Sequence, residues 1–235
     1  MSDINFFKKN KLLYWFYKIQ KIYKNKRPNY HYAEFAEDIM VSRIFKNLKK
    51  GFYLDIGAYH PYKGSLTYNL YKNGWNGMNF DISQSSIDLF NIARPRDINI
   101  NCAISDFNGE THYYENSPIN QQNSLVNQNK NQKKIKVESY KLSEILKLHN
   151  IDKADFINID TEGTELKVLT GIDFKTVNPF LLTIEDNSFN LKNENKEKKI
   201  NFLREKKYEL INIIGVTMFF VKKDDIDKIS ELIKI

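Results

Sequence analysis

The stretch from Gly51 to Asp81 constrains the fold of this chain more than any other part of the sequence. It reads as an apolar strand over residues 52–56, a turn that begins at Gly57, a helix over about residues 64–73 and a second strand that ends on Asp81. This order is a strand–helix–strand unit, in which the two strands run parallel. The sequence therefore predicts an α/β fold built on a mostly parallel sheet.

Both predicted strands end on carboxylates, at the edge of the sheet where such folds bind ligands. Asp55 and Gly57 close the first strand and Asp81 closes the second, an arrangement that holds a nucleoside-containing ligand. Gly57 would let the backbone approach the ligand, and Asp81 would accept both hydroxyls of a ribose. Residues 58–60 stand where a dinucleotide fingerprint would need glycines. A cofactor with a ribose but no phosphate is favoured, and S-adenosylmethionine is the first candidate.

Four segments extend this interpretation. They are Y-L-D-I-G-A-Y-H-P at 53–61, N-G-W-N-G-M-N-F-D at 73–81, R-P-R-D-I-N at 94–99 and F-I-N-I-D-T-E-G-T-E-L-K-V-L-T-G at 156–171. Together, in this order within residues 32–222, they resemble the FkbM-type class I methyltransferases. The resemblance implies a Rossmann-like sheet, mostly parallel, with seven strands and a terminal antiparallel hairpin. It also implies S-adenosylmethionine as cofactor and methylation of hydroxyls, often on sugars or glycosylated natural products.

Two residue sets are candidates for the chemistry. His60 directly follows the first strand, and its ordinary pKa near 6.5 suits a base that takes a proton from a substrate hydroxyl; an ordinary loop histidine is the alternative. A second apolar strand delivers Asp160 to the same edge, and Glu162 is expected to begin the next helix. Asp160 and Glu162 would position the acceptor, although an acid at a helix start also occurs for electrostatic reasons alone.

The resemblance extends the expected cofactor site. Glu37 would face the pocket, Ser65 would bind the methionine carboxylate or cap a helix, and Ile104 and Ser105 would line the adenine. Arg94 and Arg96 would meet an anionic group of the substrate or form a surface turn. The complete expected cofactor set is Glu37, Asp55, Gly57, Ala58, Tyr59, Ser65, Asp81, Ile82, Ile104, Ser105 and Asp160.

The N-terminal segment differs in composition from the rest. Residues 5–27 contain no acid, and their apolar side chains recur at helical spacing on one face; the basic residues are Lys8, Lys9, Lys11, Lys18, Lys21, Lys24, Lys26 and Arg27. This helix would pack on its own domain or a dimer mate, lie on an anionic membrane, or dock on a partner in a polysaccharide-assembly complex. Nucleic acid is a poor partner, since no nucleic-acid module follows. We divide the chain into an extension, residues 1–31, and a methyltransferase domain, residues 32–235.

Composition limits the remaining possibilities. The 235 residues, 41% hydrophobic and 14% aromatic, suffice for one α/β domain with its own core. Cys102 is the single cysteine, which excludes an internal disulfide and a cysteine-based zinc site. With no run of 18 apolar residues and no signal peptide, we expect a cytoplasmic protein, or one at the inner face of the membrane.

The other expected elements follow from periodicity and turn residues. A stretch rich in Asn, Gln and Lys over residues 116–134 would be a substrate loop or a flexible insertion. Helices are expected at 32–48, 85–93, 142–148, 190–206 and 224–235, strands at 98–105, 134–140, 156–160, 180–184, 208–214 and 216–221, and a hairpin at 106–115 around Asn108-Gly109.

The expected activity is transfer of a methyl group from S-adenosylmethionine to a sugar hydroxyl. A nucleotide-linked or polysaccharide sugar of surface-glycan biosynthesis is the expected acceptor. One alternative is a divalent-metal-dependent enzyme that uses Asp160 and the Glu185-Asp186 pair, although a metal is not required by the resemblance. A non-catalytic scaffold that binds S-adenosylmethionine is another. A nucleotide-binding oxidoreductase or epimerase is disfavoured by the missing glycines, and a homodimer stays open.

Overall fold

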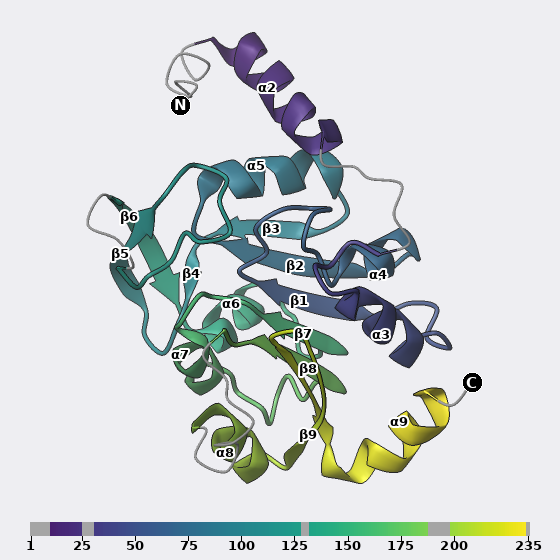
Figure 1. Cartoon of the computed structure of the whole chain (residues 1–235). Coiled ribbons are helices and arrows are strands. Elements are labelled where there is room, and N and C mark those ends of the chain that lie inside the picture. Colours follow the sequence, from purple (N-terminus) through teal and green to yellow (C-terminus); the bar gives the residue numbers. More distant parts are fainter. Residues whose placement is uncertain (1–9, 25–30, 128–131, 188–197, 234–235) are drawn as a thin grey trace.

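The computed structural model describes residues 10–24, 31–127, 132–187 and 198–233. Its centre is a seven-stranded sheet in the order β3-β2-β1-β7-β8-β10-β9 (Figure 1). The strands are β1 (Phe52–Ile56), β2 (Asn76–Asp81), β3 (Ile98–Asn101), β7 (Phe156–Ile159), β8 (Leu181–Glu185), β9 (Tyr208–Ile214) and β10 (Thr217–Lys222).

Strand direction confirms the expected Rossmann-like fold. Strands β3, β2, β1, β7 and β8 pair in parallel, whereas β10 runs antiparallel to both β8 and β9. The central strands read as continuous apolar runs because helices cover both faces of the sheet. Leu54 and Ile56 of β1 belong to one apolar cluster and Tyr53 to another, as the alternation of a strand requires.

Helices form the two outer layers. One cluster takes its helical residues from α6 (Leu142–Leu148), α7 (Glu165–Thr170) and α8 (Lys198–Glu205). The opposite cluster takes them from α3 (Glu37–Ile44), α4 (Tyr68–Lys72) and α9 (Ile226–Ile233), which follows the short helix η2 (Lys223–Asp225). Helix α5 (Gln84–Ala93) packs on β2 and β3, and α2 (Lys11–Lys24) packs on α5. No helix in the described part of the chain is long and apolar enough to cross a membrane.

A second, three-stranded sheet corrects two expectations. The strand expected at residues 98–105 is divided: β3 ends at Asn101, and β4 (Ala103–Ile104) leaves the main sheet to pair with β6 (Lys133–Tyr140). The hairpin expected around Asn108-Gly109 is also wrong, because β5 (Gly109–Glu115) pairs along its length with β6. Asn108 instead accepts a hydrogen bond from the Lys141 amide. The turn residues Asn108-Gly109 suggested that the strands on either side of them pair, whereas the partner of β5 is the more distant strand β6.

Helix bounds differ from the expected ones at several places, including the functional edge. The helix expected to begin at Glu162 begins at Glu165, because Glu162 has a left-handed backbone (φ 53°) that an α-helix does not allow. Much of the helix expected at 190–206 falls on residues 188–197, outside the described residues. By contrast, the bounds expected for 52–56, 142–148 and 208–214 agree with β1, α6 and β9.

Candidate active site

An open cavity lies at the carboxyl edge of the sheet, between the ends of β1, β2 and β7. We call it the rim cavity. Its lining residues are Ile56, Gly57, Tyr59, Phe80, Asp81, Ile82, Cys102, Ala103, Ile104, Asn120, Gln121, Asn123, Leu125, Asp160, Thr161 and Thr164. Six residues of the expected cofactor set are among them: Gly57, Tyr59, Asp81, Ile82, Ile104 and Asp160.

Gly57 closes β1 in a conformation that needs glycine, but the reason differs from the one expected. Its φ of +82° is left-handed, and a Cβ there would lie 1.6 Å from the Asp160 carbonyl oxygen. The close neighbour is thus the backbone of the strand beside it. Gly57 brings the loops after β1 and β7 together at the rim cavity.

Asp81 lines the cavity with a carboxylate that is already oriented. Its Oδ2 accepts a hydrogen bond from the Tyr59 amide at 2.8 Å, and its Oδ1 accepts one from the Ser83 amide at 2.7 Å. Burial raises the pKa of Asp81 to about 6 despite these two hydrogen bonds. Tyr59 itself has a left-handed φ of 51°. The loop therefore holds the carboxylate in place and leaves its remaining lone pairs for a ligand.

Asp160 and Glu185 form a carboxyl pair at the ends of β7 and β8. The two carboxyls are close enough to affect each other's pKa, and the Asp160 amide donates to the carbonyl of Ile56 at 2.9 Å. Burial, and then the Glu185 charge, raise the pKa of Asp160 well above its usual range. Burial, and then the Glu162 charge, raise the pKa of Glu185 to about 7. Two such carboxyls share a proton near neutral pH, since neither ionises easily beside the other.

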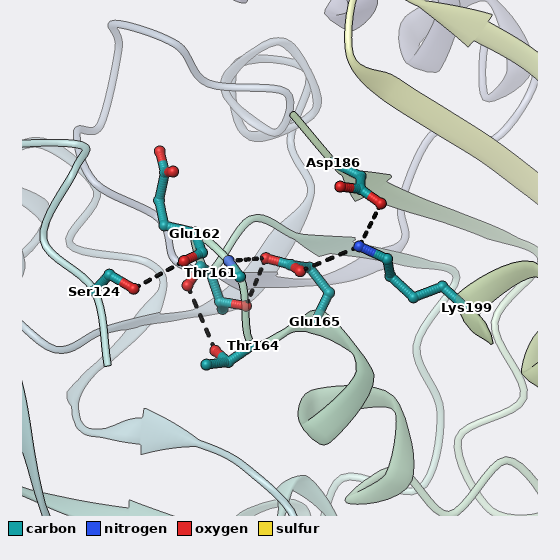
Figure 2. Close-up of polar contacts among 8 residues, drawn as sticks. Ser124, Thr161, Glu162, Thr164, Glu165, Asp186 and Lys199 are labelled. Atoms are coloured by element: carbon teal, nitrogen blue, oxygen red, sulfur yellow. Dashed lines mark hydrogen bonds and ion pairs between the residues drawn. The ribbon is translucent and has the colours of Figure 1, made fainter. Parts of the chain in front are cut away.

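The loop after β7 is held by its own side chains (Figure 2). Glu165 accepts hydrogen bonds from the Gly163 amide at 2.7 Å and from the Thr161 hydroxyl at 3.3 Å. Ser124 donates to the Glu162 carbonyl at 2.8 Å, which ties the loop to the residues that follow β5. The Glu162 side chain extends away from these contacts and carries no dashed line. Its pKa is raised, first by burial and then by the Glu165 charge.

A second hollow adjoins the rim cavity, and Asp160 lines both. We call it the acidic hollow; its lining residues are Asp160, Glu162, Gly163, Glu165, Glu185, Asp186, Asn187 and Lys199. Among the described residues that line the hollow, Lys199 is the only basic one, and it pairs with Asp186 and, at 3.5 Å, with Glu165 (Figure 2). The remaining carboxyls give this hollow a negative potential.

His60 does not lie where a base for this site would have to be. It is fully buried, lines neither hollow, and its Nδ1 accepts hydrogen bonds from the amides of Tyr62 and Lys63 at 3.1 and 3.0 Å. Burial lowers its pKa to about 4, and a hydrogen bond with the Lys21 backbone acts in the opposite direction. The geometry corrects our first choice: His60 stabilises its loop and joins it to α2.

Asp55, Ser65 and Arg94 belong to a buried network away from the rim cavity. Arg94 is fully buried and donates to Thr67 Oγ1 and Ser65 Oγ, both at 2.7 Å, and to the Pro61 carbonyl. Thr67 in turn donates to Asp55 Oδ2 at 2.6 Å. Both expectations for Arg94 were wrong, because it neither faces a ligand nor lies on the surface. Its charge is held in the interior by hydrogen bonds and by the Asp55 carboxylate behind Thr67.

The remaining expected cofactor residues are also engaged elsewhere. Glu37 accepts hydrogen bonds from the Phe35 amide and the Thr217 hydroxyl, and Ser65 Oγ accepts from the amides of Thr67 and Tyr68 just before α4, whose N-cap residue is Thr67. The amides of Ala58 and Ser105 donate to the carbonyls of Phe80 and Tyr140. None of Glu37, Asp55, Ala58, Ser65 and Ser105 lines the rim cavity.

The Asn-rich stretch forms one wall of the cavity, although none of its residues was among the expected site residues. Asn120, Gln121, Asn123 and Leu125 line it from the stretch expected to be a substrate loop or a flexible insertion. Asn123 Oδ1 accepts from the Asn116 amide at 2.9 Å, so side-chain amides order this segment locally. The abundance of Asn was the available signal. Within the described residues, no group of three or more His, Cys, Asp or Glu is placed to hold a metal ion.

Comparison with known proteins decides the family. The model of the methyltransferase FkbM domain matches residues 55–210, which include both halves of the site. The chain belongs to the FkbM methyltransferase family. The resemblance predicted from four segments is thus confirmed, and the protein is a methyltransferase. A search of curated proteins finds no match.

Solved structures offer more distant similarity. A proposed RNA methyltransferase of Pyrococcus horikoshii is 9% identical, with a TM-score of 0.45 over 80% of this chain and 82% of the other. The 1,6-didemethyltoxoflavin-N1-methyltransferase of Burkholderia thailandensis, solved with that compound and S-adenosylhomocysteine, is 12% identical, with a TM-score of 0.42 over 78% and 76%. A TehB-like S-adenosylmethionine-dependent methyltransferase of Corynebacterium glutamicum is 11% identical, with a TM-score of 0.43 over 88% and 96%.

Proposed function

We propose that this FkbM methyltransferase uses S-adenosylmethionine to methylate a hydroxyl group of an uncharged sugar. The observation that carries the proposal is the position of Asp160, which lines both the rim cavity and the acidic hollow. A cofactor in the first and an acceptor in the second would meet at this residue. Surface-glycan biosynthesis is the proposed setting.

The rim cavity would hold the cofactor. Asp81 would accept the two ribose hydroxyls, since its orientation is fixed by two backbone amides. Ile82 and Ile104 would lie against the adenine, as apolar side chains at the neighbouring strand ends. The bound sulfonium supplies an electrophilic methyl group. The chain's own task is then to place the acceptor oxygen and to remove its proton.

The carboxyl pair would remove the proton. With a pKa of about 7 at Glu185 and a raised pKa at Asp160, the pair is poised to accept a proton at neutral pH. The bound cofactor would give its methyl group to the hydroxyl oxygen and become S-adenosylhomocysteine, and the carboxyl pair would take the proton of that hydroxyl. Glu162 would orient a second hydroxyl of the acceptor through its carboxylate, which extends away from the contacts drawn in Figure 2.

The charge of the acidic hollow favours one of the expected acceptors. A nucleotide-linked sugar would bring a diphosphate close to Glu162 and Glu185, and Lys199 is already paired with Asp186 and Glu165. A neutral glycan avoids this repulsion, and its hydroxyls can donate hydrogen bonds to the carboxylates. We therefore place the neutral glycan ahead of the nucleotide-linked sugar.

Calorimetry tests the cofactor. S-adenosylhomocysteine and NAD are titrated separately into the full chain, and we expect heat of binding from the first alone. A ribose without a pyrophosphate fits the loop after β1. That loop has no glycine-rich fingerprint to hold the phosphates of NAD. Binding of NAD without S-adenosylhomocysteine would contradict the proposal.

Methyl transfer tests the acceptor. Methyl-labelled S-adenosylmethionine is incubated with a neutral oligosaccharide, with the nucleotide diphosphate derivative of the same sugar and with a catechol, each with and without EDTA. We expect label in the neutral oligosaccharide, unchanged by EDTA. Label in the catechol alone, lost with EDTA, would instead identify a metal-dependent enzyme that acts on another acceptor.

A further inference from the structure

Helix α2 has one face that packs on the domain. Tyr14 donates a hydrogen bond to Asp88 at 3.2 Å, and Lys18 lies 3.9 Å from the same carboxylate. Ile22 is buried with Tyr62 and Leu89. These contacts join α2 to α5 and to the loop after β1, so the orientation of the helix is fixed.

The opposite face of α2 is apolar and exposed. Leu12 is 63% exposed, Trp15 47%, Phe16 55% and Tyr23 58%. At 3.6 residues per turn Leu12, Phe16 and Tyr23 fall on one stripe opposite Tyr14, and Trp15 lies at the edge of that stripe, beside Ile22. Figure 1 shows α2 (purple) projecting beyond α5, on the side of the molecule away from α8 and α9. Nothing in the described chain covers the stripe, although it includes a tryptophan and a phenylalanine.

The charge around this stripe is of one sign. Residues 5–27 carry eight Lys and Arg and no acid, and the formal net charge of the whole protein is +7. The rest of the chain is therefore close to neutral. All of the excess positive charge is therefore in the segment that presents the exposed aromatic residues.

We propose that α2 lies on an anionic lipid surface, with Leu12, Trp15 and Phe16 inserted among the acyl chains near the headgroups. Large apolar side chains flanked by lysines, without acids, suit a helix that lies in the interface rather than across it. A second copy of the chain is a poor occupant, because pairing two α2 helices would bring their lysines together. This proposal is independent of the acceptor.

The place of α2 would hold the site near the membrane. Tyr14 reaches Asp88 in the early part of α5, and α5 begins just after Asp81 at the carboxyl edge of the sheet. His60, in the loop that also carries Tyr59, is bonded to the Lys21 backbone. The docked helix would thus be attached to two segments that form the rim cavity.

Vesicle sedimentation tests the surface. The full chain is mixed with phosphatidylcholine vesicles with and without phosphatidylserine, and we expect binding only with the anionic lipid, reduced by added salt. The double variant Leu12→Ser, Phe16→Ser should bind at least about tenfold more weakly, since each large apolar side chain contributes about that factor or more when buried. Leu148→Ser, at a position 78% exposed on α6, is the matched control and should bind like wild type. Equal binding by both variants would overturn the proposal.

Trp15 reports insertion directly. Trp75, the other tryptophan, is 1% exposed, so a blue shift of the emission on addition of anionic vesicles would come from Trp15. We expect the shift in wild type and its loss in Trp15→Phe, which keeps an apolar ring. Neutral and anionic vesicles that leave the emission unchanged, together with a dimer in light scattering that Leu12→Ser, Phe16→Ser dissociates, would assign the stripe to a second copy instead.

Discussion

Asp160 is the residue at which the two parts of the site meet. Its amide is bonded to β1, its carbonyl oxygen excludes a side chain at position 57, and the nearby Glu185 charge helps to raise the pKa of its carboxyl. Burial is the main cause of the raised pKa, so the strand that carries Asp160 into the interior also prepares it to accept a proton. One residue thus joins the packing of the sheet edge to the proposed chemistry.

Glu185→Gln separates the base from the packing. We expect kcat to fall about 100-fold or more, because Gln keeps the shape but cannot take a proton. In wild type, kcat/KM should rise with pH through about 7, as the pair loses its shared proton. The pH profile and kcat measured with a neutral glycan acceptor check both points. A variant that retained kcat and the wild-type profile would remove Glu185 from the mechanism.

Asp81→Asn tests the proposed grip on the cofactor. Its new NH₂ group would meet either the Tyr59 or the Ser83 amide, donor against donor, so the loop loses a hydrogen bond and the ribose loses an acceptor. We expect S-adenosylhomocysteine to bind about tenfold or more weakly by calorimetry, with kcat at saturation changed less. Ser65→Ala, outside the cavity, is the control and should keep the wild-type affinity.

His60→Leu distinguishes the predicted base from the structural role that the geometry gives. We expect the free energy of unfolding to fall by about 1–3 kcal/mol, because leucine offers no acceptor and the two buried amides bonded to Nδ1 lose their partner. The kcat/KM profile should keep its rise through about pH 7. Denaturant unfolding and a pH profile on the same variant decide the matter, and loss of that rise with stability intact would restore His60 as the base.

The loops after β1 and β7 act as one element at the rim of the sheet. Their contact depends on Gly57, where a Cβ would stand 1.6 Å from the Asp160 carbonyl. We expect Gly57→Ala to destabilise the protein by several kcal/mol, since it adds this clash to a left-handed φ. Gly74→Ala is the control, because its φ of +93° is also left-handed but nothing lies within 4 Å of the added methyl group. Similar melting temperatures for the two variants would contradict this account.

The elements also show what the sequence could predict. Strand β1 agreed in its bounds because an apolar run between turn residues is a local signal, and the carboxylates at strand ends followed from the direction of parallel strands. The second sheet could not be found, since β5 pairs with β6 across the long intervening loop. The sequence also predicted ligand roles for Asp55 and Arg94, which instead bond to Thr67 in the interior. Which face of β1 meets Thr67 and which meets the cavity depends on how the helices pack on the sheet, and the sequence does not show this.

At the scale of the whole molecule, buried titratable groups link stability to pH in two opposing ways. His60 has a folded pKa of about 4, below its ordinary 6.5, so its burial costs stability as pH falls from about 6.5 to 4. Asp81 and Glu185 have folded pKa values of about 6 and 7, above their ordinary values. The folded state binds more protons at these carboxyls than the unfolded chain does, so their contribution falls as pH rises through those values.

Above about pH 6.5 only the carboxyls act, because His60 is then neutral in both states. We therefore expect the melting temperature to fall between about pH 6.5 and 8. Glu185→Gln should reduce that fall, because it removes the Glu185 charge that repels the Asp160 charge. At pH 8 the variant should melt about 2 °C or more above wild type, with a smaller difference at pH 6, where the wild-type pair keeps its proton. Scanning calorimetry of both proteins at the two pH values measures this. A variant that melted below wild type at pH 8 would mean that the ionised pair stabilises the fold. That result would contradict the repulsion that we give as a cause of the raised pKa values.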